Sequence, residues 1–69
     1  MSKITPEMHR QMNHLAGMPY SHVTMKDSDI QVMLLETGGN QLACGRLYNY
    51  VVTPIGAGVS RVSLTPTHL

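Results

Sequence analysis

Apolar positions recur with helical spacing near the start of the chain. Met8, Met12 and Leu15 fall at i, i+4 and i+7, which places the three side chains on one face of a helix. Pro6 suits the first helical position, because the N–H that proline lacks would have no partner there. The pattern therefore predicts a helix at about residues 6–16.

The strongest pattern in the middle of the chain consists of two β-like runs separated by a pair of glycines. Gly38 and Gly39 suit a two-residue hairpin loop that needs positive φ. This interpretation predicts strands at about 30–37 and 41–52. In that register Leu34 would face Ala43 on one side of the sheet.

Two shorter segments add to the predicted sheet. Residues 59–65 indicate a further strand, and residues 22–25 fit a short edge strand. The sequence as a whole predicts a single α+β domain over residues 1–69. Its N-terminal helix would pack on a small antiparallel sheet of three or four strands.

Both sides of the predicted hairpin carry apolar side chains. One helix can cover only one side, so we expect a second copy of the chain, or another protein, to cover the other. The alternative is that the C-terminal tail and residues 21–28 fold over it. The residues predicted to contact a partner are Met33, Leu35, Leu42, Tyr48 and Tyr50, with Arg46 as a polar anchor.

The composition agrees with a partly covered surface. Charged residues make up 13% of the chain, about half the usual ~25%, whereas apolar residues make up 42%. This shortage of charge predicts a homo-oligomer. The net charge of +1 predicts neither nucleic-acid nor membrane binding, and no apolar run approaches the ~20 residues of a membrane span.

The single cysteine, Cys44, excludes a disulfide within one chain. Together with an N-terminal stretch that lacks a secretory pattern, it predicts a reducing compartment, the cytoplasm. No metal site or cofactor is expected, because no pair of potential ligands has the close spacing of a structural zinc site. Those potential ligands are His9, His14, His22, His68 and Cys44.

Catalytic chemistry is not indicated either. Acid–base catalysis needs titratable groups held in a dry cleft, and the chain shows no nucleophile paired with a base. A small sheet with one helix also offers little pocket depth. The sequence therefore predicts that the protein is not an enzyme.

An alternative function is binding of single-stranded nucleic acid or of nucleotides. Arg46, Tyr48 and Tyr50 share one side of a strand by period-two counting, and Arg61 could add a further contact. Bases stack on tyrosine, and arginine contacts phosphate. A related alternative is a small-molecule sponge with pockets between subunits. The few basic residues are scattered, however, and form no basic stripe.

One segment resembles a known family. Residues 32–51, VMLLETGGNQLACGRLYNYV, resemble the strand–turn–strand of the Sm/Hfq-like proteins, with apolar alternation and a glycine inside the second strand. The resemblance implies a small Sm-like open barrel as an alternative fold. The family's nucleotide-contact motif is not identifiable here, so no site residue follows from the resemblance.

These observations predict a non-catalytic binding or structural subunit. It would form a homo-oligomer and act by occupying a surface of a macromolecular partner, in the first place a protein. Compact single-domain proteins of phages and mobile elements act in this way as inhibitors, regulators or assembly components.

Overall fold

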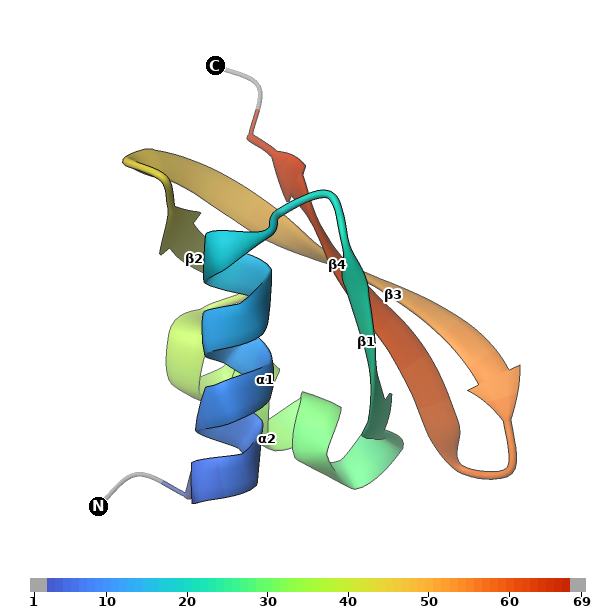
Figure 1. The fold of residues 1–69 in the computed structure, drawn as a ribbon. Coiled ribbons are helices and arrows are strands. Elements are labelled where there is room, and N and C mark those ends of the chain that lie inside the picture. The colour runs from blue at the N-terminus through green and yellow to red at the C-terminus, as the bar shows by residue number, and fades with distance from the viewer. Residues whose placement is uncertain (1–2, 68–69) are drawn as a thin grey trace.

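The computed structural model describes residues 3–67, which form two helices and one four-stranded sheet (Figure 1). In chain order the elements are α1 (Pro6–Gly17), β1 (His22–Lys26), α2 (Asp27–Thr37), β2 (Asn40–Ala43), β3 (Arg46–Gly56) and β4 (Val59–Pro66). The strand order is β1-β4-β3-β2, and all neighbouring strands are antiparallel. The predicted fold class, an N-terminal helix packed on a small antiparallel sheet, is confirmed.

Helix α1 forms where the apolar spacing indicates it. The Thr5 side chain caps the helix by accepting a hydrogen bond from the backbone N–H of Met8 at 3.2 Å. Met8 and Leu15 are buried, so the apolar stripe is the face that packs on the sheet. The helix runs through Gly17, one residue beyond the predicted range.

The prediction of a strand over 30–37 is wrong, because this stretch belongs to helix α2. Ile30 and Met33, three residues apart, are both buried on one helical face. Two aspartates, Asp27 and Asp29, occupy the first turn, where negative charge favours a helix. The sheet is therefore built without residues 30–37, and the chain has a second helix.

The glycine pair ends this helix instead of joining two strands. Gly38 has a φ of 71° and is the left-handed C-cap of α2, with its N–H bonded to the Leu34 carbonyl at 2.9 Å. Positive φ was correctly expected at this position. The predicted pairing of Leu34 with Ala43 does not form, since Leu34 is helical.

The hairpin turn lies six residues further along the chain. Cys44 and Gly45 have φ values of 52° and 76°, as a type I′ turn requires. They divide the strand predicted over 41–52 into β2 and β3. The new register pairs Leu42 with Leu47. The final strand, predicted over 59–65, forms as β4.

The Sm-like alternative is not supported. The resemblance depends on a strand within residues 32–37, and these residues are helical. The sheet has four strands among the described residues, and its tight turns fall at other positions than the resemblance implies. The strand–turn–strand similarity is thus a similarity of apolar pattern alone.

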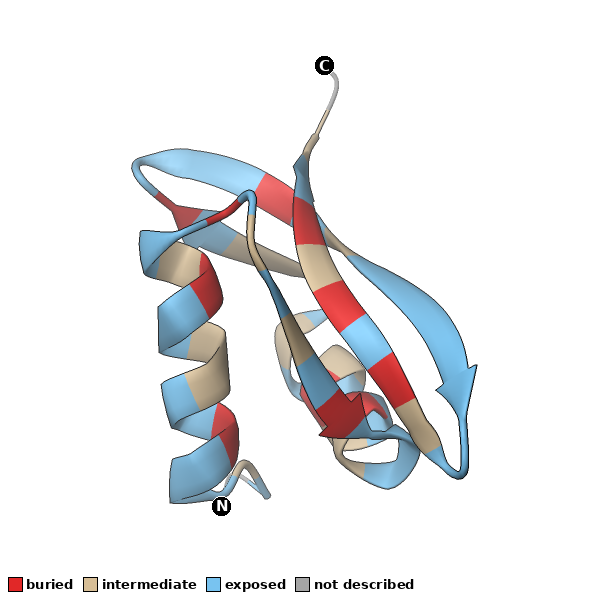
Figure 2. Ribbon diagram, turned by 45° about the vertical axis from the view of Figure 1, so that its right-hand side comes forward, coloured by how far each residue is buried: buried red, intermediate tan, exposed pale blue. Residues whose placement is uncertain are grey.

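Both helices lie on the same, concave side of the curled sheet (Figures 1 and 2). The buried apolar side chains of both helices and of all four strands form one cluster between these layers. Its members are Met8, Leu15, Met25, Ile30, Met33, Ala43, Tyr48, Val62 and Leu64. The opposite, convex side of the sheet carries no helix.

Side-chain hydrogen bonds fix α1 to the sheet. Gln41 donates from Nε2 to the Met12 carbonyl at 2.9 Å, and Gln11 donates from Nε2 to the Thr24 carbonyl at 3.1 Å. The first bond joins α1 to β2 and the second joins it to β1, which lie at opposite edges of the sheet. The helix is therefore held across the whole width of the concave side.

Candidate interaction surface

The convex side of the sheet presents a surface that we call the outer face. Side chains alternate along each strand, and the buried positions of β2, β3 and β4 identify the concave side. The alternate positions therefore form the outer face, which includes Leu42, Leu47 and Val51. These three side chains are 70%, 42% and 39% exposed, respectively. Within residues 3–67 no helix covers this side, and the sheet exposes there a strip of apolar side chains that the polar Asn49 interrupts between Leu47 and Val51.

One end of this strip is a cross-strand pair. Leu42 of β2 lies opposite Leu47 of β3, one position from the Cys44-Gly45 turn. Pairs at such a position are not hydrogen-bonded to each other, and their side chains approach more closely than those of hydrogen-bonded pairs. The two leucines therefore form one continuous apolar projection instead of two isolated ones.

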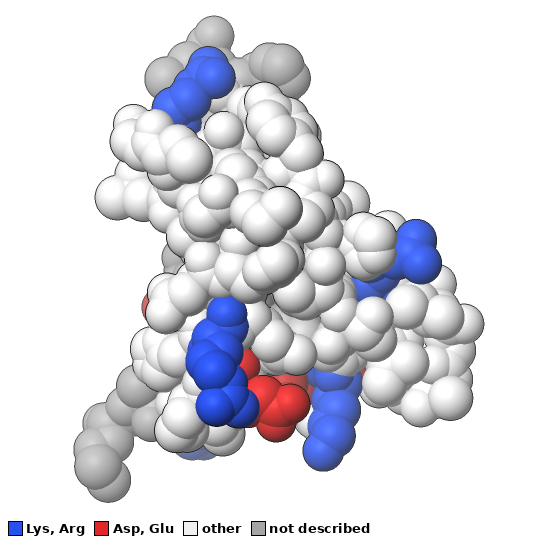
Figure 3. Space-filling model, in the orientation of Figure 1, with Lys and Arg blue, Asp and Glu red and all other residues white. Residues whose placement is uncertain are grey.

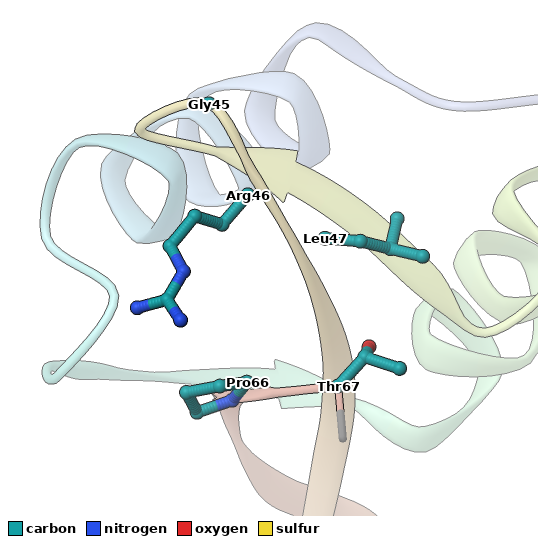
Figure 4. A pocket seen from close by; sticks show the side chains of 5 residues that line it. All are labelled: Gly45, Arg46, Leu47, Pro66 and Thr67. Carbon is teal, nitrogen blue, oxygen red and sulfur yellow. The ribbon is translucent and has the colours of Figure 1, made fainter. Parts of the chain in front are cut away.

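A shallow pocket of about 300 Å³ adjoins the strip at the end of the sheet (Figure 4). Its lining residues are Gly45, Arg46, Leu47, Pro66 and Thr67. The Thr67 hydroxyl is buried and has no hydrogen-bond partner within residues 3–67. Figure 4 shows the Leu47 side chain pointing away from those of Arg46 and Pro66, so the pocket adjoins the outer face only at Leu47.

Charge is divided between the layers of the fold. All four acidic residues lie on the helices: Glu7 on α1, and Asp27, Asp29 and Glu36 on α2. The strands carry only basic charged side chains, Lys26, Arg46 and Arg61. Figure 3 shows basic and acidic side chains side by side in the lower part of this view, and isolated basic side chains elsewhere on an uncharged surface. The outer face carries the charged side chain of Arg61 opposite Thr53, whereas Leu42 and Leu47 lie at the Cys44-Gly45 end of the sheet, away from it.

The predicted partner-contact residues occupy different environments. Leu42 and Arg46 are exposed on the sheet, and Leu35 is 85% exposed but lies on α2. Met33 and Tyr48 are in the core, so neither side chain is accessible to a partner. Of the predicted set, therefore, only Leu42 belongs to the outer face, and Arg46 lines the pocket beside it.

Tyr50 has a structural position on the concave side. Its hydroxyl donates a short hydrogen bond to Gln41 Oε1, and the same amide donates to the Met12 carbonyl. Burial raises the pKa of Tyr50 to about 12. The Tyr50 hydroxyl is thus part of the link between β3, β2 and α1.

The residues predicted for nucleotide binding are not brought together. The Tyr48 ring is 3% exposed and cannot stack on a base. Arg61 pairs with Thr53, five positions along β3 from Tyr48, and points to the outer face. Arg46, by strand alternation, belongs to the other side. No observation of this structure favours a base-stacking platform.

Sequence reasoning did not identify Leu47 and Val51 as surface residues. A signal was present, because Cys44-Gly45 also lies between runs of alternating apolar residues. Placing the turn there assigns Leu47 and Val51 to the same side of the sheet as Leu42. The glycine pair at Gly38 was the stronger turn signal and determined the predicted register.

Neither a metal-ligand cluster nor a helix that could cross a membrane is found in the described part of the chain. Within it, no three His, Cys, Asp or Glu residues lie close enough to hold a metal ion. Cys44 is a free, exposed thiol, and His68 lies outside the described residues. Neither helix in residues 3–67 has the length and apolar character needed to cross a membrane. The chain matches no family model, no curated protein and no solved structure.

Proposed function

We propose that the protein is a non-catalytic binding subunit that self-associates through the outer face of its sheet. In this form it acts by occupying a surface of a macromolecular partner, a protein in the first place. The observation that carries the proposal is the exposed cross-strand pair of Leu42 and Leu47 on the outer face, which no helix of residues 3–67 covers. The exposed free thiol of Cys44 supports a reducing, cytoplasmic location.

A second copy of the chain is the occupant that the apolar strip of the outer face fits best. In a two-fold interface each surface meets itself, so charged positions near the axis would repel their own copies. The cross-strand pair of Leu42 and Leu47 carries no charge. An interface formed around Leu42 and Leu47, away from Arg61 on the same face, would bury apolar surface of both copies without bringing like charges together.

The area required is a modest part of this small chain. A standard interface buries roughly 800 Å² per partner. The exposed surface of the chain is 4669 Å², so such an interface would cover roughly a sixth of it.

Sedimentation equilibrium of paired leucine variants tests self-association. Leu42→Ser combined with Leu47→Ser removes the exposed leucine pair, and we expect the wild-type assembly to dissociate to monomers. Leu35→Ser is the matched control, because Leu35 is more exposed than either residue but lies on α2. A wild-type monomer at micromolar concentration, or equal dissociation in the control, would contradict the proposal.

Salt dependence separates a protein partner from nucleic acid. Binding of a labelled single-stranded oligonucleotide is measured by anisotropy from low to physiological salt. Counterion release makes nucleic-acid affinity fall steeply over this range. We expect no saturable binding at physiological salt. Tight oligonucleotide binding with a steep salt slope would overturn the assignment to a protein partner.

A further inference from the structure

Strand β3 extends well beyond the strand that covers its free edge. The pairing of β2 with β3 ends at Asn40 and Asn49, and a last bond runs from the Tyr50 N–H to the Gly39 carbonyl at 3.1 Å. β3 itself continues to Gly56 and, among residues 3–67, is paired there only with β4 on its other side. The second half of β3 is therefore an open sheet edge.

The direction of the Tyr50 bond defines which backbone groups face this edge. Backbone groups of alternate residues point to opposite sides of a strand. Since the Tyr50 N–H points away from β4, the N–H and carbonyl of Val52 and the carbonyl of Pro54 point the same way. Proline has no N–H, so this edge offers one free donor, at Val52, and acceptors at Tyr50, Val52 and Pro54.

The edge is accessible from solvent. Residues 51–58 are all exposed, and Figure 2 shows this half of β3 extending past the helices. Val51 and Val52 are 39% and 37% exposed and lie on opposite faces of the strand. An added strand would thus find apolar side chains beside it on both faces.

We infer that this open edge binds an extended strand of a different polypeptide. An antiparallel strand centred opposite Val52 would form roughly four hydrogen bonds, two with Val52 and one with each carbonyl of Tyr50 and Pro54. The partner must supply free N–H groups at three alternate residues, which excludes proline there. Its side chains next to Val51 and Val52 would be apolar or β-branched.

A second copy of the same edge is a poor partner. Each copy contributes only the Val52 N–H, so two copies paired edge to edge form roughly two hydrogen bonds in any register. The remaining carbonyls would face one another without donors. Pro54 thus permits a donor-rich foreign strand while disfavouring edge-to-edge assembly, as prolines on edge strands do.

Amide NMR with a synthetic strand tests this inference. The probe is an acetylated heptapeptide of alternating threonine and valine, added at millimolar concentration to the full-length protein. We expect the largest shift at the Val52 amide and about tenfold slower hydrogen exchange there. N-methylation of three alternate peptide residues should weaken binding at least about tenfold, because it removes the required donors.

Two protein variants make the result independent of self-association through the outer face. The Leu42→Ser and Leu47→Ser double variant should bind the peptide like wild type. Val52→Pro should lose binding while its remaining amide spectrum stays dispersed, because the Val52 N–H takes no part in pairing with β4. Equal binding of the N-methylated peptide, absence of binding, or shifts confined to the outer face would overturn the inference.

Discussion

The Ser60 hydroxyl donates a hydrogen bond to Oδ1 of Asp27 at 2.6 Å. Ser60 is buried in β4, and Asp27 is the first residue of α2. The Asp27 N–H also bonds to the Gly58 carbonyl at 2.9 Å, so the start of α2 is joined twice to the β3–β4 hairpin. These bonds place the helix that the sequence pattern did not predict.

Replacing Ser60 with alanine should destabilise the protein by about 1–2 kcal/mol, because the hydrogen bond to a carboxylate is lost. For a domain of this size each kcal/mol lowers Tm by roughly 4–8 °C. Thermal unfolding followed by circular dichroism measures the change. Ser63→Ala, on the same strand but on the outer face, is the control and should change Tm little. Equal effects of both substitutions would contradict the role assigned to Ser60.

The glycines at the ends of the two helices should respond in opposite directions to alanine. Gly17 lies within α1, where a Cβ meets nothing within 4 Å, so Gly17→Ala should stabilise by about 0.5–1 kcal/mol. Gly38 has a φ of 71°, so Gly38→Ala should destabilise by about 1–2 kcal/mol although space is also available there. Urea unfolding of the two variants measures both signs. A stabilised Gly38 variant would contradict the left-handed cap.

Tyr50 should make stability depend on pH in the alkaline range. Its pKa is raised from 10.0 to about 12 in the folded state by burial, so the folded protein retains a proton that the unfolded chain loses. The stabilisation is fully present below pH 10 and is lost as pH rises toward 12. Urea unfolding between pH 9 and 12 should show a shallower decline for Tyr50→Phe than for wild type. Parallel curves would contradict this role of Tyr50.

Replacing Pro54 with valine should add a second donor to the open edge of β3. Two copies of this variant can then form about twice as many edge-to-edge hydrogen bonds as wild type. We expect assemblies larger than those of wild type, measured by light scattering over time. Ile55→Thr is the control, since it changes an exposed neighbour without adding a backbone donor. An unchanged assembly size for Pro54→Val would contradict the protective role of Pro54.

Local signals were sufficient for α1. Thr5, Pro6 and the spacing of Met8 and Leu15 all act within a few residues of one another, and each favours the same helix. Such segments are predictable because no distant contact is needed to choose their conformation.

The segment before Gly38 shows the opposite case. A short apolar run fits a strand or a buried helix equally well, and a glycine at positive φ ends a helix as readily as it forms a hairpin turn. The choice of register then decided every expected face of the sheet. With the turn placed at the glycine pair, Tyr48 and Tyr50 were predicted to lie on the contact surface, although they pack toward the core. Leu47, which is exposed, was not predicted to lie on that surface.

The sequence alone determined that this chain is a small α+β domain with an apolar surplus, because composition and local spacing carry that information. Only the tertiary structure decided where the surplus lies. Burial of Ile30 and Met33 in the core places α2 on the concave side of the sheet. The hairpin turn falls at Cys44-Gly45, after this helix. In this register Leu42 and Leu47 lie on the outer face. The local pattern allows several conformations, and contacts between distant segments select one of them.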